Sequence, residues 1–179
     1  ICNFSNVYAK YGGAFKAEDG ATLAVEASSF QNVYTYNEYT YDESTYSYGG
    51  VFYGHTNVTI TVNESLFQDC KANHEGGVLW MIYDSLAIIT ASLFENIYAE
   101  TETDSYAYAY FGWWSRCGGA IFLEESQLVL RSSSFSGIHS EWGGAIFAYG
   151  SSTRMLSTIN RVPDSCDILI EDCDFTETW

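Results

Sequence analysis

The apolar and polar positions of the chain repeat at regular intervals and predict short strands with one buried face. Relative to a recurring phenylalanine, the positions seven and five residues before it are apolar, and the position four before it is polar. The apolar positions are Leu23, Ile60, Ala87, Leu128 and Ile168, then Val25, Val62, Ile89, Leu130 and Ile170, and the polar ones are Glu26, Asn63, Thr90, Arg131 and Glu171. Alternation with period two is typical of a half-buried strand. Because the columns recur, like residues are expected to stack about 4.8 Å apart along one axis.

Two short motifs alternate and set the length of the repeat. Pairs of glycines followed by a small and an apolar residue begin at Gly12, Gly49, Gly76, Gly118 and Gly143. A Phe-x-polar-apolar motif begins at Phe4, Phe30, Phe67, Phe94 and Phe135, with a degenerate copy at Phe175. The uninterrupted repeat is about 26 residues long, which is within the range of solenoid repeats.

These patterns predict an all-β fold, a right-handed parallel β-helix of about five to six coils, with residues 1–179 as one domain. A single coil cannot bury its apolar face, whereas its neighbours can cover it. The glycine pairs allow a bend or a close approach between coils. The alternative is a β-sandwich of hairpins, but that fold favours Asn-Gly or Asp-Gly turns, and only Asp19-Gly20 is present.

The motifs resemble the repeats of polymorphic outer-membrane proteins and of related adhesin-like right-handed β-helix proteins. Gly118-Gly119-Ala120-Ile121 and Phe94-Glu95-Asn96-Ile97 carry the resemblance most clearly. This chain departs from the repeat motifs of that family at Val51 and Val78, which replace alanine, and at Gly137, which replaces asparagine. The resemblance implies a surface-exposed β-helix involved in adhesion or architecture, and it implies no catalytic residue.

Three insertions interrupt the array, near residues 34–48, 98–117 and 151–165. The first two are rich in aromatic residues that alternate with small, polar or acidic ones, so the rings are expected on one face of an extended segment. The candidates for a binding surface are Tyr36, Tyr39, Tyr41, Tyr106, Tyr108, Tyr110, Trp113 and Trp114. Such rings either cover the flank of the helix or contact another molecule.

One outward column, six residues before the phenylalanine, becomes apolar towards the C-terminus. Its members are Ala24, Thr61, Ile88, Val129 and Leu169. Such a stripe is expected to be covered either by an insertion or by another subunit.

The charge balance excludes some partners and disfavours catalysis. With 23 acidic and 7 basic residues, the net charge is −16, which repels nucleic acid and acidic polysaccharides. No apolar run is long enough to span a membrane. No cofactor motif is present, and the acidic pair Asp172 and Asp174 lacks the basic partners that a polysaccharide lyase uses. Three alternating acids, Glu100, Glu102 and Asp104, are weak candidates for Ca²⁺, and a solvated acidic loop is the favoured interpretation.

Cysteines and glycosylation sequons favour an extracellular or cell-surface location. The sequons are at Asn3, Asn57 and Asn63. Cys2 and Cys173 occupy the same column at opposite ends of the array and are candidates for a disulfide between stacked subunits. Cys70 and Cys117 fall in equivalent connections and are candidates for an internal one.

The sequence therefore predicts an extracellular structural or adhesive β-helix protein. Its expected partners are copies of itself, stacked end to end in a filament or surface coat, or flanking coils of a longer chain. The chain begins inside a repeat, which suits either arrangement. The alternatives are a glycan-binding module that uses the aromatic insertions and, less favoured, a polysaccharide lyase or hydrolase.

Overall fold

The structure is a computed structural model that describes residues 2–35, 47–99, 117–150, 152–155 and 165–179. The described residues form strands joined by turns, and they contain no helix. Every pairing between the named strands is parallel. The prediction of an all-β fold with parallel strands is thus confirmed, and the hairpin sandwich is wrong for the described strands.

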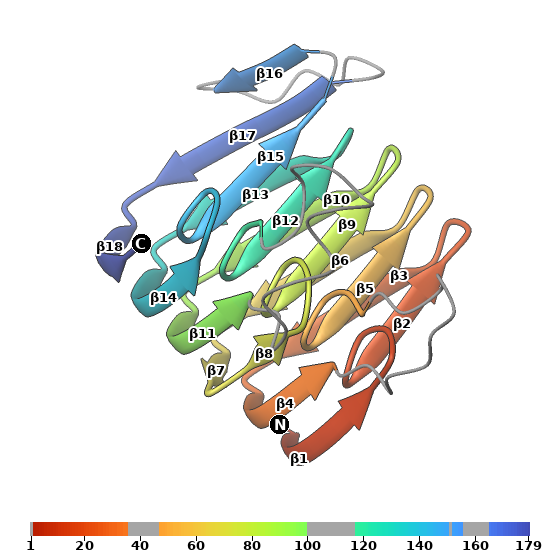
Figure 1. Ribbon diagram of the computed structural model, residues 1–179. Helices are drawn as coiled ribbons and strands as arrows, with labels where there is room; N and C mark the ends of the chain where they lie inside the picture. The colour runs from red at the N-terminus through yellow and green to blue at the C-terminus, as the bar shows by residue number, and fades with distance from the viewer. Residues whose placement is uncertain (1, 36–46, 100–116, 151, 156–164) are drawn as a thin grey trace, which may run out of the picture.

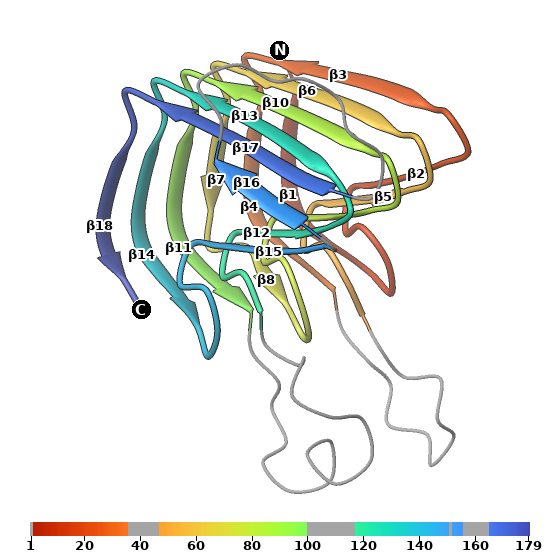
Figure 2. The same ribbon diagram turned by 90° about the horizontal axis from the view of Figure 1, so that it is seen from above.

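The chain passes in turn through three sheets, numbered here in the order in which it meets them, and one such passage is called a coil (Figures 1 and 2). The first sheet contains β1 (Asn3–Ala9), β4 (Ser29–Thr35), β7 (Leu66–Gln68) with β8 (Lys71–Ala72), β11 (Leu93–Ala99), β14 (Ser134–Ser140) and β18 (Asp174–Thr178). The second contains β2 (Phe15–Glu18), β5 (Phe52–His55), β9 (Leu79–Ile82), β12 (Ile121–Glu124) and β15 (Ile146–Tyr149). The third contains β3 (Thr22–Glu26), β6 (Thr59–Asn63), β10 (Leu86–Thr90), β13 (Gln127–Arg131), β17 (Ser165–Glu171) and β16 (Ser152–Met155).

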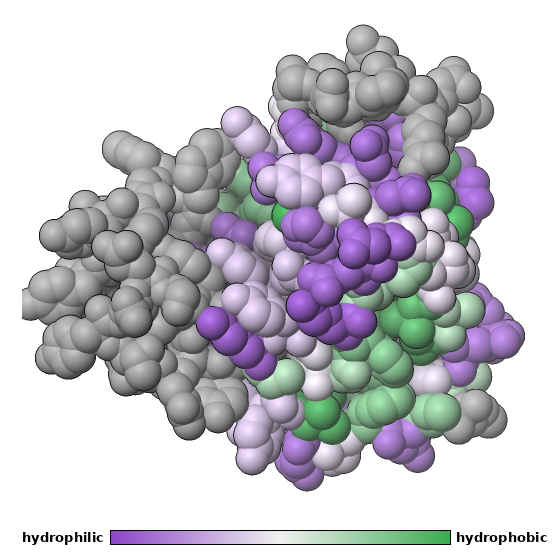
Figure 3. All heavy atoms as spheres, turned by 90° about the vertical axis from the view of Figure 1, so that its right-hand side faces the viewer, coloured by the Kyte–Doolittle hydropathy of each residue, from purple (hydrophilic) through white to green (hydrophobic). Residues whose placement is uncertain are grey.

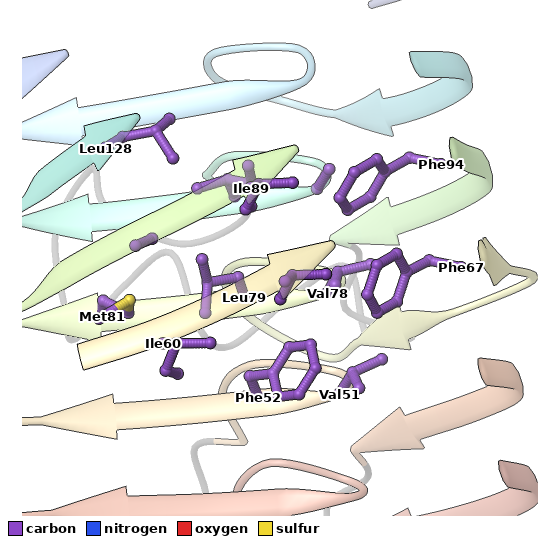
Figure 4. Close-up of a cluster of buried hydrophobic side chains, with 14 of the residues drawn as sticks. Val51, Phe52, Ile60, Phe67, Val78, Leu79, Met81, Ile89, Phe94 and Leu128 are labelled. Atoms are coloured by element: carbon purple, nitrogen blue, oxygen red, sulfur yellow. The ribbon is translucent and has the colours of Figure 1, made fainter. Parts of the chain in front are cut away.

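The core lies between the three sheets and consists of the apolar columns that the sequence predicts (Figure 4). Each motif phenylalanine stacks on the next, with ring centroids 4.3–5.0 Å apart and interplanar angles of 4–18°. Leu128 pairs in register with Ala87 and Ile168, as the alignment of the repeats predicts. Burial of each such side chain contributes roughly 1.5–3 kcal/mol, so the coils stabilise one another mainly by covering each other's apolar faces.

A buried column of serines runs along the corner between the third and first sheets. Its members are Ser28, Ser65, Ser92 and Ser133. Each hydroxyl donates to the carbonyl two residues earlier, at 2.8–2.9 Å. Each also accepts from a main-chain N–H of the preceding coil, at 3.1–3.3 Å. The polar column is therefore hydrogen-bonded on both sides, which makes its burial tolerable.

The motif residues have specific backbone roles at the bends. The polar residue of the Phe-x-polar-apolar motif has a left-handed conformation in every coil, with φ between 51° and 64°. Asparagine, aspartate and glycine adopt this conformation most easily, which explains why Gly137 can replace asparagine. The second glycine of the glycine pair lies against the next coil. A Cβ on Gly119 would come within 2.5 Å of the Gly144 carbonyl oxygen.

The strand order changes at the C-terminal end. β16 lies inside the insertion predicted at residues 151–165 and pairs with β17 on the side away from β13. In the described part of the chain, the first and third sheets each have six levels, with β7 and β8 sharing one, and the second sheet has five strands, of which β15 is the last. A strand within this insertion was not predicted, because its alternation is short and follows no repeat motif.

Candidate functional surfaces

An aromatic column follows the outward face of the first sheet, four residues after each motif phenylalanine. We call it the ring ladder; its members are Tyr8, Tyr34, Lys71, Tyr98, His139 and Trp179. Tyr8 stacks on Tyr34 at 5.6 Å, and Tyr98 stacks on His139 at 5.1 Å. The side chains of Tyr8 and Trp179 are 59% and 72% exposed. The ladder thus combines ring edges with polar groups at a spacing set by the coils.

Amide and carboxylate side chains run beside the ring ladder on the same face. The Gln31 amide donates to the Gln68 side-chain oxygen at 3.4 Å, and the Asn96 amide donates to Asp69 Oδ1 at 3.2 Å. These groups are exposed and repeat with the coils. Together with the ring ladder they form a regular array of hydrogen-bonding groups, suited to an elongated polar ligand.

A second set of rings lies on the outward face of the second sheet, and it is buried. We call it the flank cluster; it contains Tyr53, Trp80, Ile82, Cys117 and Phe122, with Tyr11, Tyr48 and Phe147 packed against it. Trp80 stacks on Tyr53 and on Tyr48, each at 4.7 Å. Burial raises the pKa of the Tyr53 hydroxyl to about 12, with Glu18 adding to the effect. Since these rings are already covered, they are poor candidates for binding a ligand in this conformation.

The flank cluster encloses a carboxyl group. Glu75 precedes a glycine pair and is 8% exposed, and its Oε2 accepts a hydrogen bond from Trp80 Nε1 at 2.9 Å. Burial raises its pKa to about 7; the Trp80 hydrogen bond opposes this rise and the charge of Glu124 adds to it. Burial likewise raises the pKa of Glu124, with Glu125 adding to it. Glu75 is therefore the carboxyl of this sheet that is expected to change charge near neutral pH.

All five cysteines lie in the described part of the chain, and none forms a disulfide. The proposed Cys70–Cys117 pair is wrong: Cys70 points into the core between the sheets, whereas Cys117 belongs to the flank cluster outside the second sheet. Equivalent connections therefore did not mean equivalent directions. Burial raises the pKa of each of these two thiols to about 12.

Cys2 and Cys173 continue the serine column at its two ends, as their shared sequence position predicts. The Cys2 N–H donates to the Ser28 hydroxyl at 3.3 Å, and the Cys173 thiol donates to the Glu171 carbonyl oxygen at 3.2 Å. Cys2 is exposed and Cys173 is partly buried. Each end of the stack thus carries a thiol in the same column.

The three sequons differ in accessibility. Asn3 and Asn57 are exposed, and Asn57 is in a turn with φ of 56°. Asn63 is half-buried, and the Ser65 hydroxyl of its sequon belongs to the buried serine column. Asn3 and Asn57 are therefore the better candidates for carrying a glycan; occupancy itself is untested.

The aromatic candidates Tyr36, Tyr39, Tyr41, Tyr106, Tyr108, Tyr110, Trp113 and Trp114 lie outside the described residues. So do the calcium candidates Glu100, Glu102 and Asp104. Among the described residues, no group of three or more His, Cys, Asp or Glu side chains is arranged to hold a metal ion. These predictions stay as predictions.

The apolar outward column of the third sheet is partly covered within the chain. Val129 and Leu169 are 8% and 7% exposed, and Ile88 is half-buried. No second subunit is needed to bury Val129 and Leu169. In the same sheet, Asp167 is fully buried and has no hydrogen-bond partner among the described side chains, and the register aligns it with Arg154 of β16.

The ring ladder and the flank cluster were missed by the sequence reading, although a signal for both exists. The ladder occupies a fixed position four residues after the motif phenylalanine. Four rings of the flank cluster, Tyr53, Trp80, Phe122 and Phe147, lie three residues after the second glycine, and Tyr11 and Tyr48 directly precede the first. Aligning outward positions as well as inward ones would have found both columns. Which of the two is covered could not be read from the alignment.

Comparison with known proteins gives one match. The repeat of the Chlamydia polymorphic membrane protein family matches residues 132–149. This segment contains one phenylalanine motif and one glycine pair, so the resemblance seen in the motifs is confirmed there. No curated protein and no solved structure matches the chain. In the described residues, no helix is long and apolar enough to cross a membrane.

Proposed function

We propose that this chain is a right-handed parallel β-helix that serves as a structural or adhesive element at the cell surface. The match to a repeat of polymorphic membrane proteins supports the surface location. The right-handed winding is supported by the parallel sheets, since crossover connections between parallel strands are right-handed in about 98% of cases.

The observation that carries the proposal is the unbroken stacking of like residues from one end to the other. Phe4 and Phe175 are the first and last of six stacked rings. Such an array provides a stiff spacer with long repetitive faces, and catalysis does not need it. Arg131, which is in register with Glu171 next to the Asp172–Asp174 pair, forms an ion pair with the Glu171 carboxylate at 2.6 Å. These features favour a scaffold over a polysaccharide-cleaving enzyme.

The two ends of the stack support continuation by further coils, either of another copy or of flanking chain. At the first coil, Phe4, Phe15 and Leu23 are only partly buried, and Phe175 in the last is 39% exposed. Figure 3 shows apolar side chains gathered beside polar ones on the side of the molecule that carries β2 and β3 in Figure 1. Exposed apolar patches of this kind are typical of contact surfaces.

Assembly and disulfide trapping test the proposal. If copies stack with β1 on β18, Cys2 and Cys173 lie one level apart, about 4.8 Å, which is within the range for a disulfide. Mild oxidation is then expected to give ladders of covalent multimers on non-reducing gels, and electron microscopy to show filaments. Cys2→Ser or Cys173→Ser should abolish the ladders, whereas Cys70→Ser should leave them intact. A chain that stays monomeric and shows no filaments at high concentration would contradict stacking of copies.

A second candidate function is binding of an uncharged glycan along the first sheet. The exposed ring ladder and the neighbouring amides favour it, while the net charge of −16 disfavours acidic glycans. Binding on a glycan array is expected to be lost in the Tyr8→Ala, Tyr34→Ala double variant. If binding depends instead on Tyr106, Tyr108 and Trp113, the insertions form the site, and if no glycan binds, this candidate fails.

A further inference from the structure

Two tyrosines of the ring ladder lie side by side on neighbouring strands of the first sheet. Tyr8 of β1 and Tyr34 of β4 are partners in the parallel register, and Figure 1 shows the two strands next to each other. Their rings stack with centroids 5.6 Å apart and an interplanar angle of 20°. The contact between the two phenols is therefore set by strand pairing and does not depend on the conformation of a loop.

Both rings of this pair are accessible from solvent. The exposed fractions are 59% for Tyr8 and 38% for Tyr34, so a reagent in solution can reach each phenol. The torsion that turns an aromatic ring about its bond to Cβ is broad, with no narrow staggered wells. The two exposed rings can therefore turn from the stacked arrangement to one in which their edges meet, while the strands stay paired.

The other stacked tyrosines that the structure describes lack one of these features. Tyr11 and Tyr48 stack at 6.1 Å, but both are partly buried and pack against the flank cluster, which restricts the rotation of their rings. Tyr98 belongs to the ring ladder but stacks on His139, which carries no phenol. Among the described residues, the pair on β1 and β4 thus combines exposure with a phenol neighbour held in register.

We propose that Tyr8 and Tyr34 are a site of oxidative cross-linking, at which hydrogen peroxide and a haem peroxidase join the two rings by a carbon–carbon bond. Each phenol loses one electron and one proton and becomes a phenoxyl radical. The radicals couple through one ring carbon of each that is adjacent to the hydroxyl-bearing carbon. The hydrogens on these two carbons then move to the oxygens, which restores both phenols. The peroxide takes up the two electrons and two protons and leaves as two water molecules.

The product is a covalent cross-link between two coils. It closes a loop that runs from Tyr8 through β2 and β3 to Tyr34. A cross-link of this kind reduces the conformational freedom that the chain gains when β1 separates from β4, so it opposes that separation. Because both residues belong to one chain, the cross-link depends neither on stacking of copies nor on binding of a glycan.

Treatment of the whole chain with peroxidase and hydrogen peroxide, at several low chain concentrations, tests the proposal. Sequencing of joined peptides by mass spectrometry is expected to find Tyr8 linked to Tyr34, with the loss of two hydrogens and a yield per chain that does not change with concentration. Free tyrosine, which dimerises under the same conditions, confirms that the reagent is active. Linkage of Tyr8 mainly to Tyr36 or to a second chain, or no linkage of Tyr8 at all, would overturn the proposal.

Two phenylalanine variants identify the phenols that react. Tyr34→Phe keeps the stacked ring but removes one phenol, so the peptides linked at Tyr8 should disappear. Tyr98→Phe makes the same change elsewhere on the ring ladder and should leave their yield unchanged. If Tyr34→Phe fails to fold, Tyr8→Phe removes the other phenol and answers the same question. An equal yield of linked Tyr8 in Tyr34→Phe and in the parent would contradict the assignment.

Hydrogen exchange measures what the cross-link does to the fold. In the oxidised parent, exchange of the β1 amides is expected to be roughly tenfold slower, or more, than in oxidised Tyr34→Phe, because opening of β1 is restricted. Exchange in β13, which contains no tyrosine, should be the same in both. If β1 exchanges at the same rate with and without the cross-link, the link does not hold the two coils together and this part of the proposal is wrong.

Discussion

The central coils and the C-terminal end of the stack contain the same columns of residues in different surroundings. Phe94 is fully buried, whereas Phe175, two coils later in the same column, is 39% exposed. Gly119 lies against the next coil, whereas Gly144 does not. In such a repeat, the contribution of a residue to stability therefore depends on its position in the motif and on whether another coil lies above it.

The largest effect is expected from shortening the stacked phenylalanines. Phe94→Ala should lower the free energy of unfolding by about 3–5 kcal/mol, because it leaves a cavity between two coils. Phe175→Ala is the matched change at the open end and should cost less than about 2 kcal/mol. Denaturant unfolding followed by circular dichroism measures both. Equal losses would mean that the end is covered in solution, so the comparison must be repeated at several chain concentrations.

The glycine pairs give the next contrast. Gly119→Ala forces the Cβ against the Gly144 carbonyl and should destabilise the chain by about 3 kcal/mol. Gly144→Ala meets no close neighbour, so only the backbone strain of its positive φ remains, about 1 kcal/mol. Melting temperatures of the two variants distinguish the cases. A larger loss for Gly144→Ala than for Gly119→Ala would contradict the difference in surroundings between the two glycines.

The buried carboxyl of the flank cluster predicts a pH dependence of stability. The folded chain keeps the Glu75 proton up to about pH 7, whereas the unfolded chain loses it near the ordinary value of 4.5. The unfolding free energy should therefore fall as pH rises between these values. Below this window both states are protonated and no stability is lost; above it the loss is complete, at about 3 kcal/mol.

Glu75→Gln tests this dependence. The amide can still accept the hydrogen bond from Trp80 but carries no charge. The variant should therefore lose the fall in unfolding free energy between pH 4.5 and pH 7 and be more stable than the parent at pH 8. Glu64→Gln, at an exposed carboxylate in a turn, is the control and should leave the profile unchanged. If Glu75→Gln and the parent have parallel stability profiles from pH 4 to pH 8, the carboxyl is not buried in solution.

The smallest of these effects is expected in the serine column. Ser92→Ala removes the acceptor of the buried Ser65 N–H and one of two donors to the Thr90 carbonyl oxygen, which keeps its hydrogen bond from the Glu64 N–H. The expected loss is about 1–2 kcal/mol. Ser136→Ala, on the outward side of β14, should change the unfolding free energy by less than about 0.5 kcal/mol. Equal effects of the two substitutions would show that the column contributes no net stability.

Much of the fold was predictable because it depends on local periodicity. The alternation at Leu23 and Val25 and its return in every coil predicted both the parallel pairing and the register. The β16 strand was not predictable, since its place depends on which strand edge remains open after β17 has paired with β13. That is a long-range choice with no signal in the segment itself.

The candidate surfaces were less predictable than the fold. Cys2 and Cys173 fall where their shared column predicts, because both continue the serine ladder. Cys70 and Cys117 do not lie together as predicted. They fall in equivalent connections of the repeat, but this equivalence does not specify which side of a sheet each residue faces. The burial of Glu75 and Trp80 depends on what covers the second sheet, and a column alignment contains no information on that.

For this protein, the sequence by itself determined the strands, their columns and the residues that fill the core, because period-two alternation and glycine pairs act locally in every coil. The tertiary structure alone decided which aromatic column is exposed and which carboxyl is buried. These properties depend on contacts between residues far apart in the chain. The physical reason is that burial and strand pairing are set by the neighbouring coil, and the end of a stack lacks one.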